Sequence, residues 1–171
     1  MVPLDREGGV FCQTYISDEV LPEAVIPGRK GDHTLCSAIL YLISGACFSR
    51  MHRLPTEEIF HFYLGDPVAL FLISPQGPPR TVLLGQDVLS GMEVQFVVPA
   101  GWWQGSRLLD GGQWAFLGTT MAPAYTDADY TDADADVLCR AYPDFAREIR
   151  LLTAPPQFPE TSSANMDPSH L

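Results

Sequence analysis

His52 and Glu58 are the two residues of this chain best suited to do chemistry together, because they place an imidazole and a carboxylate six positions apart. His52 lies near the end of one apolar-rich run, and Glu58 begins the next run after a turn at Pro55-Thr56. An imidazole titrates near neutral pH, and a carboxylate can do so when its pKa is raised. Such a pair predicts acid/base chemistry if both side chains face one enclosed space.

Strand alternation predicts which neighbours share that space. Side chains two positions apart in an extended segment lie on the same face. Glu58, Phe60 and Phe62 therefore share one face, and His61 lies on the other. A barrel closed over the first face would surround the carboxylate with aromatic rings and raise its pKa.

Short apolar runs at regular spacing surround the pair, and each is bounded by Gly, Pro, Asp or Ser. Many short strands with frequent turns favour an antiparallel all-β sandwich or barrel. Residues 21–33, which contain two prolines and two glycines, are expected to form a loop. The predicted strands lie within residues 7–20 and over 35–44, 48–53, 59–64, 68–74, 81–84, 93–98 and 114–120.

Helical signals are confined to the C-terminal part. The acidic residues 127–136 lead into an apolar stretch that suits a helix start, and Pro143 separates it from a second short helix. Phe145, Ile149 and Leu152 share a face of that second helix. Beyond residue 153 the chain is rich in Pro and Ser and has no periodicity. We expect one domain over residues 1–153 and a disordered polar tail over 154–171.

Composition limits the partners. The chain has 171 residues, a formal charge of −11 and only ten scattered Lys and Arg residues. Nucleic acids and anionic membranes would be repelled, because binding to them depends on clustered basic residues. Four cysteines without C-x-x-C spacing indicate reduced, mostly buried thiols. No apolar run is long enough to span a bilayer, and the first residues do not resemble a signal peptide. We expect a cytoplasmic protein.

Several separated motifs resemble the cupin superfamily, and most closely its small cupin 5 group, a domain family of unknown function. The motifs occur in the right order and span residues 7–126. They are Glu7-Gly8-Gly9 with Thr14-Tyr15, residues 37–43, Phe48-Ser49 with His52-Arg53, residues 58–63 with Gly65-Asp66-Pro67, residues 98–102 and residues 118–123.

The resemblance implies a double-stranded β-helix (jelly-roll) barrel with short C-terminal helices, a conical pocket and pairing into homodimers through the N-terminal strands. Metal-dependent cupins bind their ion with three histidines and one Glu or Gln. This chain keeps His52 and Glu58 but has Leu54 and Gln104 at the other two positions. Leucine cannot bind a metal, and an amide oxygen is a weak ligand. No cofactor is favoured. A divalent transition metal, if present, would be held by His52, Glu58 and Gln104.

The residues predicted to act are His52 and Glu58 as the catalytic pair and a surrounding set of substrate-binding side chains. Each has a purely structural alternative. His52 could be an ordinary barrel histidine, Glu58 could pair with Arg50 or Arg53, and Trp102 could simply pack. The predicted substrate-binding residues are Tyr15, Ser49, Phe60, Phe62, Trp102 and Gln104.

Three functions remain open from the sequence. The favoured one is a metal-independent acid/base enzyme, an isomerase, epimerase, cyclase or lyase acting on a small molecule. A metal-dependent enzyme with an incomplete ligand set is the second. A non-catalytic small-molecule binding protein, whose aromatic pocket suits a ring-bearing or apolar ligand, is the third.

Overall fold

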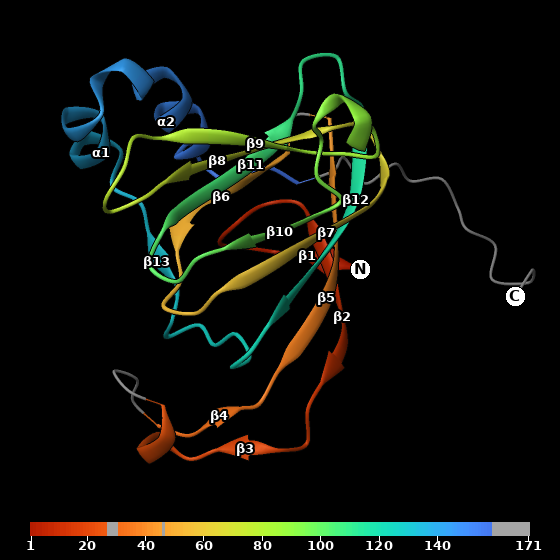
Figure 1. Ribbon diagram of the computed structural model, residues 1–171, viewed down its shortest axis with the longest axis vertical. Helices are drawn as coiled ribbons and strands as arrows, with labels where there is room; N and C mark the ends of the chain where they lie inside the picture. The colour runs from red at the N-terminus through yellow and green to blue at the C-terminus, as the bar shows by residue number, and fades with distance from the viewer. Residues whose placement is uncertain (27–30, 46, 159–171) are drawn as a thin grey trace, which may run out of the picture.

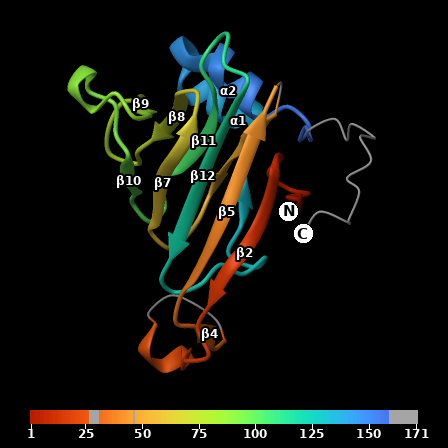
Figure 2. The ribbon, with the colours of Figure 1, turned by 90° about the vertical axis from the view of Figure 1, so that its right-hand side faces the viewer.

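The computed structural model describes residues 1–26, 31–45 and 47–158, and two antiparallel sheets face each other within them (Figure 1). The six-stranded sheet contains, in order, β1 (Val2–Pro3), β2 (Val10–Ile16), β5 (Ser37–Ser44), β12 (Trp114–Met121), β7 (Glu58–Gly65) and β10 (Gln95–Val98). The five-stranded sheet contains β13 (Thr131–Asp132), β6 (Phe48–Arg53), β11 (Trp103–Leu108), β8 (Val68–Ile73) and β9 (Arg80–Leu84). Figure 2 shows β2, β5, β12 and β7 side by side.

The chain passes repeatedly from one sheet to the other. Strand β5 is followed by β6 in the opposite sheet, then β7 returns to the first sheet and β8 to the second. This alternation is the double-stranded β-helix, and the two short helices follow at the C-terminal end. The predicted all-β jelly-roll class with short C-terminal helices is confirmed.

One strand next to the candidate site was not predicted. Strand β11 contains Gln104, Gly105 and Ser106, a polar and glycine-containing stretch that lacks the apolar character of its neighbours. It nevertheless lies in the middle of its sheet, between β6 and β8. The predicted loop over residues 21–33 was also incomplete, because β3 (Val20–Leu21) pairs with β4 (His33–Thr34) and residues Glu23–Val25 form a 3-10 turn.

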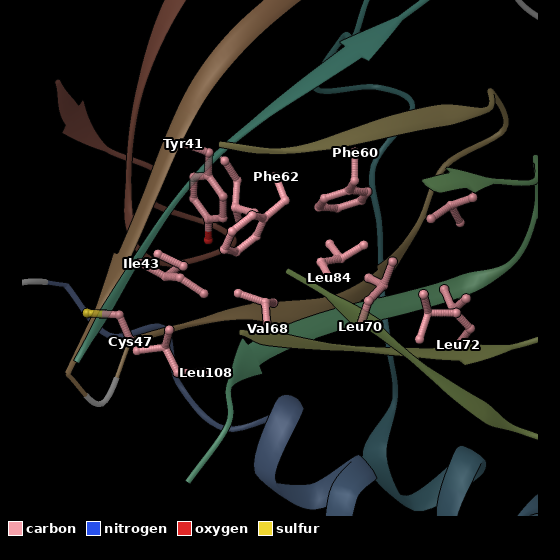
Figure 3. Packing of buried hydrophobic residues seen from close by; sticks show 14 residues of the cluster. Tyr41, Ile43, Cys47, Phe60, Phe62, Val68, Leu70, Leu72, Leu84 and Leu108 are labelled. Atoms are coloured by element: carbon pink, nitrogen blue, oxygen red, sulfur yellow. The ribbon is translucent and has the colours of Figure 1, made fainter. Parts of the chain in front are cut away.

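The main core lies between the sheets (Figure 3). Strand β8 shows why its sequence is continuously apolar: Val68, Leu70 and Leu72 point into this core, while Phe71 and Ile73 belong to a second cluster. Both faces of β8 are therefore covered, which removes the polar alternation typical of a half-exposed strand.

The second cluster joins the helices to the outer face of the five-stranded sheet. Helices α1 (Ala135–Ala141) and α2 (Ala146–Leu152) supply Leu138, Ile149 and Leu152, which pack with Met51 and Phe71. Helix α1 begins where the Asp134 carboxylate accepts a hydrogen bond from the Val137 amide at 3.0 Å.

The first residues of the predicted tail contact the barrel. Ala154 packs against the helix cluster, and the Gln157 carbonyl accepts a hydrogen bond from the Gly9 amide at 2.9 Å. From residue 159 on, the predicted tail lies outside the described residues.

The four cysteines are free, with Cys47 and Cys139 buried, Cys36 partly buried and Cys12 exposed. Within the described parts of the chain, no helix combines the length and the apolar character needed to cross a membrane.

Candidate functional site

A cavity of about 910 Å³ opens at the end of the barrel where β6 ends and β7 begins. Its wall combines both sheets with the N-terminal segment, so residues distant in sequence meet there. Four buried polar side chains line it: Ser37, His52, Glu58 and Thr119. The other lining residues are Met1 to Glu7, Phe11, Cys12, Gln13, Ile39, Leu54, Met121, Tyr125 and Asp127.

Two hydrogen-bonding neighbours fix the His52 ring. Its Nδ1 lies 2.7 Å from the Arg50 carbonyl oxygen, which can only accept a hydrogen bond. Its Nε2 lies 3.2 Å from Nε2 of Gln104, directly across the β6–β11 pairing. A carbonyl on one side and an amide N–H on the other select the neutral imidazole with the proton on Nδ1.

Gln104 also joins His52 to the opposite sheet. Its Nε2 donates to Oε2 of Glu58 at 2.6 Å, so one amide group serves both predicted catalytic residues. The pairing shifts between Gln104, which faces His52, and Ser106, which faces Ser49, so a bulge with one extra residue lies in β6 next to this side chain. The Gln104 Oε1 is buried without a hydrogen-bond partner among the described residues. The structure thus links His52 and Glu58 through Gln104.

The surroundings of His52 and Glu58 shift both pKa values so that the neutral form of each side chain is favoured. Burial raises the pKa of Glu58, as the sequence predicted, and the nearby Glu7 raises it further, while His52, Thr119 and Gln104 oppose the shift. Burial lowers the pKa of His52, against the opposing influence of Glu58 and the Arg50 carbonyl. A carboxyl group with a raised pKa can both take and return a proton near neutral pH.

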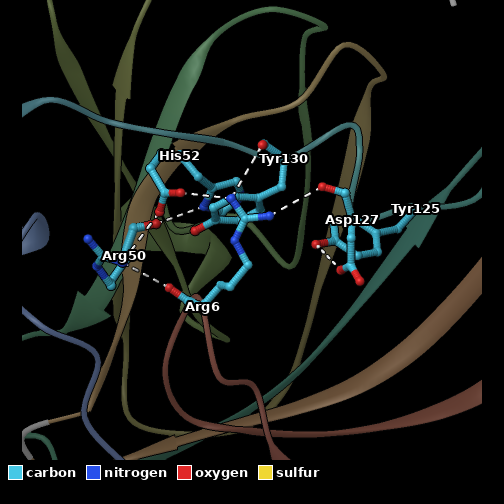
Figure 4. Close-up of polar contacts among 7 residues, drawn as sticks. Arg6, Arg50, His52, Tyr125, Asp127 and Tyr130 are labelled. Carbon is cyan, nitrogen blue, oxygen red and sulfur yellow. Dashed lines mark hydrogen bonds and ion pairs between the residues drawn. The ribbon is translucent and has the colours of Figure 1, made fainter. Parts of the chain in front are cut away.

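Tyr130 and Arg6 form a layer beside His52 (Figure 4). The Tyr130 ring stacks on the imidazole, and the Arg6 guanidinium lies 4.2 Å from the Tyr130 ring centroid. Arg6 also donates to Asp132 at 2.7 Å and to the backbone oxygen of Asp127 at 3.2 Å. The N-terminal segment and residues 127–132 are thereby connected to His52.

Glu7 is a site residue that the sequence analysis did not single out for chemistry. Its carboxyl group lines the cavity and accepts a hydrogen bond from the Ser49 hydroxyl at 2.5 Å. Burial raises the pKa of Glu7 to about 7, and only the Ser49 hydrogen bond opposes this. The available signal was the Glu7-Gly8-Gly9 motif, because both glycines adopt positive φ values of 106° and 68°. This backbone turns the segment so that Glu7 reaches β6.

The predicted substrate-binding residues fall into three places. Gln104 and Ser49 are buried behind the cavity wall, where they hold Glu58 and Glu7. Phe60 and Phe62 lie in the main core and Trp102 packs against it, and none of these three lines the cavity. Tyr15 is 54% exposed on β2. Contact of β2 with a second copy, and hence the homodimer, stays a prediction.

The side chains of His52, Leu54 and His61 point in the directions that strand alternation predicts. His52 and Leu54 both line the cavity, as expected for side chains two positions apart. His61 lies on the other face of β7, where its Nε2 is 3.1 Å from the Thr120 hydroxyl. The proposed ion pair of Glu58 with Arg50 or Arg53 is not observed among the described residues, since Arg50 pairs with Asp132 and Arg53 lies over the Trp103 ring.

The donor set fits a transition metal poorly. No group of three His, Cys, Asp or Glu side chains within the described ranges is arranged to hold an ion. His52 Nε2 and Glu58 Oε2 both face the Gln104 amide nitrogen, which is a donor and repels a cation. Turning the amide over would supply only a weak oxygen ligand.

Two facing sheets in the β-helix arrangement, with a polar cluster enclosed at one end, define a cupin barrel. A family model described as "Cupin superfamily (DUF985)" matches residues 2–133. The chain belongs to this family, as its motifs predicted. No curated protein matches the chain.

Solved structures agree with this assignment. A crystal structure of a Shewanella oneidensis protein is similar at 29% identity, with a TM-score of 0.74 over 87% of this chain and 89% of that one. A hypothetical protein from Leishmania major is 23% identical, with a TM-score of 0.77 over 88% and 92% of the two chains. A cupin 2 domain-containing protein from Halorhodospira halophila shares the fold at 13% identity, with a TM-score of 0.56 over 84% and 83%.

Proposed function

We propose that this cupin is a metal-independent enzyme that moves a proton on a small organic molecule, as an isomerase, epimerase, cyclase or lyase does. The observation that supports this most is the position of Glu58. This carboxyl group lines a cavity of about 910 Å³, is only 8% exposed and has a raised pKa. Burying an ionisable group costs free energy of folding, and groups with such shifted pKa values cluster at functional sites.

Glu58 is the group that takes the proton. Its carboxylate removes a proton from a C–H bond next to a carbonyl group of the ligand, and the bonding electron pair moves into that carbonyl. The protonated Glu58 then returns the proton to another atom or to the other face of the ligand. In a lyase, the same electron pair expels a leaving group instead. The donors from Gln104 and Thr119 stabilise the ionised form that begins the cycle.

His52 acts through position and electrostatics. Because its Nε2 accepts from Gln104 and its Nδ1 donates to Arg50, the neutral ring fixes the amide that Glu58 uses. A protonated His52 would present an N–H toward the Gln104 N–H, so the amide would have to turn over. His52 therefore keeps Gln104 in the orientation that favours an ionised Glu58.

Hydrogen exchange tests the proposal without knowledge of the reaction. Small metabolites, including sugars and keto and amino compounds, are first screened for those that raise the melting temperature, since a ligand stabilises the folded state by mass action. Each ligand is then incubated with the protein in D₂O and followed by proton NMR. We expect a ligand C–H signal to disappear through deuterium incorporation, or signals of an isomer or elimination product to appear.

Variants connect the exchange to the site. Glu58→Gln keeps the shape and should reduce the exchange rate by at least about 100-fold, the usual scale of general acid/base catalysis. Glu57→Gln is the matched control, because this neighbouring carboxylate is exposed and does not line the cavity. A ligand that binds but returns unchanged and without deuterium would favour the binding-protein alternative. A stoichiometric transition metal in protein purified without added metal would overturn the metal-independent proposal.

A further inference from the structure

The charges around the cavity are unequal. Four carboxyl side chains line it, those of Asp5, Glu7, Glu58 and Asp127. Arg6 is the lining residue with a permanent positive charge among those the structure describes. Both of its terminal nitrogens are already engaged, one with the Asp127 carbonyl and the other with Asp132 and the Tyr130 carbonyl. These contacts use three of the five guanidinium N–H groups and pair the charge with Asp132, so an anionic ligand would compete with Asp132 for that charge.

Glu7 lacks a positive partner. The Ser49 hydroxyl is the hydrogen-bond donor to its carboxyl group, and that bond occupies Oε1. No described residue donates to Oε2, which belongs to a side chain on the cavity wall. The backbone is fixed in place, since the Glu7 carbonyl accepts from the Arg50 amide and its amide donates to Leu4. The Glu7 carboxyl group is therefore held with one oxygen available to a ligand.

Ser37 adds a second polar group on the same wall. It is 6% exposed and lines the cavity, yet its hydroxyl has no hydrogen-bond partner within the described part of the chain. This hydroxyl group is therefore available to form a hydrogen bond with a ligand in the cavity.

We propose that the cavity binds a small organic cation, a compound with a protonated amine and an apolar body, whose ammonium group contacts Glu7. This proposal deepens the proposed function by naming the substrate class of the same site. An ammonium group has three N–H donors and no acceptor. The wall carries matching acceptors in Glu7, Glu58 and Ser37. The apolar body lies against lining side chains such as Phe11, Ile39, Leu54 and Met121.

Charge favours this class over the alternatives. A phosphate or carboxylate ligand is bound most strongly by an unpaired Arg or Lys, and the Arg6 charge is already paired with Asp132. A neutral alcohol could bond to Ser37 but would leave the Glu7 charge uncompensated in a low-dielectric site. Phe11 and Tyr125 add aromatic faces on the cavity wall, which attract cations and repel anions.

The test compares ligands that differ only in head group. Amine, alcohol and carboxylate forms are built on phenylethyl, cyclohexylmethyl and butyl bodies, and binding to the whole protein is measured by isothermal titration calorimetry. We expect an amine to bind most tightly on at least one body and about tenfold more tightly than the matching alcohol. The carboxylates should bind most weakly. A carboxylate that binds as tightly as its amine, or a failure of all three amines to bind, would overturn the proposal.

A variant locates the contact. Glu7→Gln should weaken amine binding by about tenfold and leave alcohol binding unchanged. Glu57→Gln changes the net charge equally and should have no effect, because Glu57 is exposed and lies outside the cavity wall. Equal loss in both variants would mean that only the net charge matters, which contradicts a Glu7 site. Circular dichroism verifies that each variant is folded.

The pH dependence gives an independent readout. The pKa of the empty Glu7 is about 7, and an ammonium group binds the ionised form. Amine affinity should therefore rise from pH 6 to pH 8 and rise less in Glu7→Gln, where the change that remains comes from Glu58, whose pKa is also raised. Binding does not require turnover, so the two proposals fail separately. Deuterium exchange without amine binding refutes the cation proposal. Amine binding without exchange in any carbonyl compound that binds the cavity refutes the enzyme proposal.

Discussion

The imidazole of His52 stacks on the phenol ring of Tyr130, with ring centroids 4.7 Å apart and 17° between the ring planes. The two residues lie 78 positions apart in the chain. His52 is in β6, and Tyr130 directly precedes β13, the strand that pairs with β6. Tyr130 is 7% exposed, and its hydroxyl has no partner among the described residues. The ring, not the hydroxyl, is therefore the part of Tyr130 that contacts His52.

Removing the hydroxyl and removing the ring should have different effects. Tyr130→Phe keeps the stack and removes a buried unsatisfied group, so the free energy of unfolding should stay the same or rise by up to about 1 kcal/mol. Tyr130→Ala leaves a cavity beside His52 and should lower it by about 3 kcal/mol. Urea unfolding followed by fluorescence measures both. A loss of more than 1 kcal/mol in the Phe variant would show that the hydroxyl has a partner.

Gln104 satisfies two buried acceptors, so its loss should be expensive. Gln104→Leu leaves His52 Nε2 and Glu58 Oε2 without a donor, which should reduce the free energy of unfolding by about 2–3 kcal/mol. The pKa of Glu58 should rise further, because the amide donor favours the ionised form. Ser106→Ala on the same strand is the control. Its buried hydroxyl has no partner in the described structure, so removal should change stability little. Equal losses in both variants would argue against the bridging role.

Gly8 is the position where a side chain cannot be tolerated. Its φ of 106° disfavours any other residue, and an added Cβ would collide with the backbone oxygen of Phe48. Gly8→Ala should therefore cost about 3 kcal/mol or more, since it combines backbone strain with a clash. Gly111→Ala, with a φ of 89° and open space around the added Cβ, should cost only about 1 kcal/mol. If thermal unfolding shows similar losses of stability in Gly8→Ala and Gly111→Ala, the loss comes from backbone strain alone and not from the clash with Phe48.

Glu7 should make stability depend on pH in a defined direction. The pKa of this carboxyl group is 4.5 in its ordinary state and about 7 in the folded chain. Below pH 4.5 the group is protonated in both states and has no effect. Between these values the unfolded chain loses the proton first, so the folded state becomes less stable as pH rises, by about 3 kcal/mol at pH 8.

The isosteric Glu7→Gln variant removes this effect. Its free energy of unfolding should approach that of the wild type near pH 4.5 and exceed it by about 3 kcal/mol at pH 8. Denaturant unfolding across this range, without ligand, measures the difference. His52 acts in the opposite direction, because its lowered pKa destabilises the fold as pH falls, but it is the same in both proteins and cancels. A constant difference across pH would contradict the burial of Glu7.

Local pattern was sufficient to predict much of the fold and the central pair. The spacing of apolar runs, the two-residue alternation around Glu58 and the turn residues between strands are properties of neighbours in the chain. They correctly predicted the barrel and the shared orientation of His52 and Leu54, and the family motifs added Gln104. Strand β11 escaped prediction because its inward residues are polar and are stabilised by partners on other strands.

Contacts between distant segments carry no such local signal. Glu7 meets Ser49 across 42 positions, and Tyr130 reaches His52 only because β13 pairs with β6. Phe60 and Phe62 share the Glu58 face as predicted, but the depth of the barrel places them in the core and not on the cavity wall. Alternation along a strand defines which way a side chain points. How far it lies from solvent, and which charge it meets there, depends on how the two sheets and the N-terminal segment close around it.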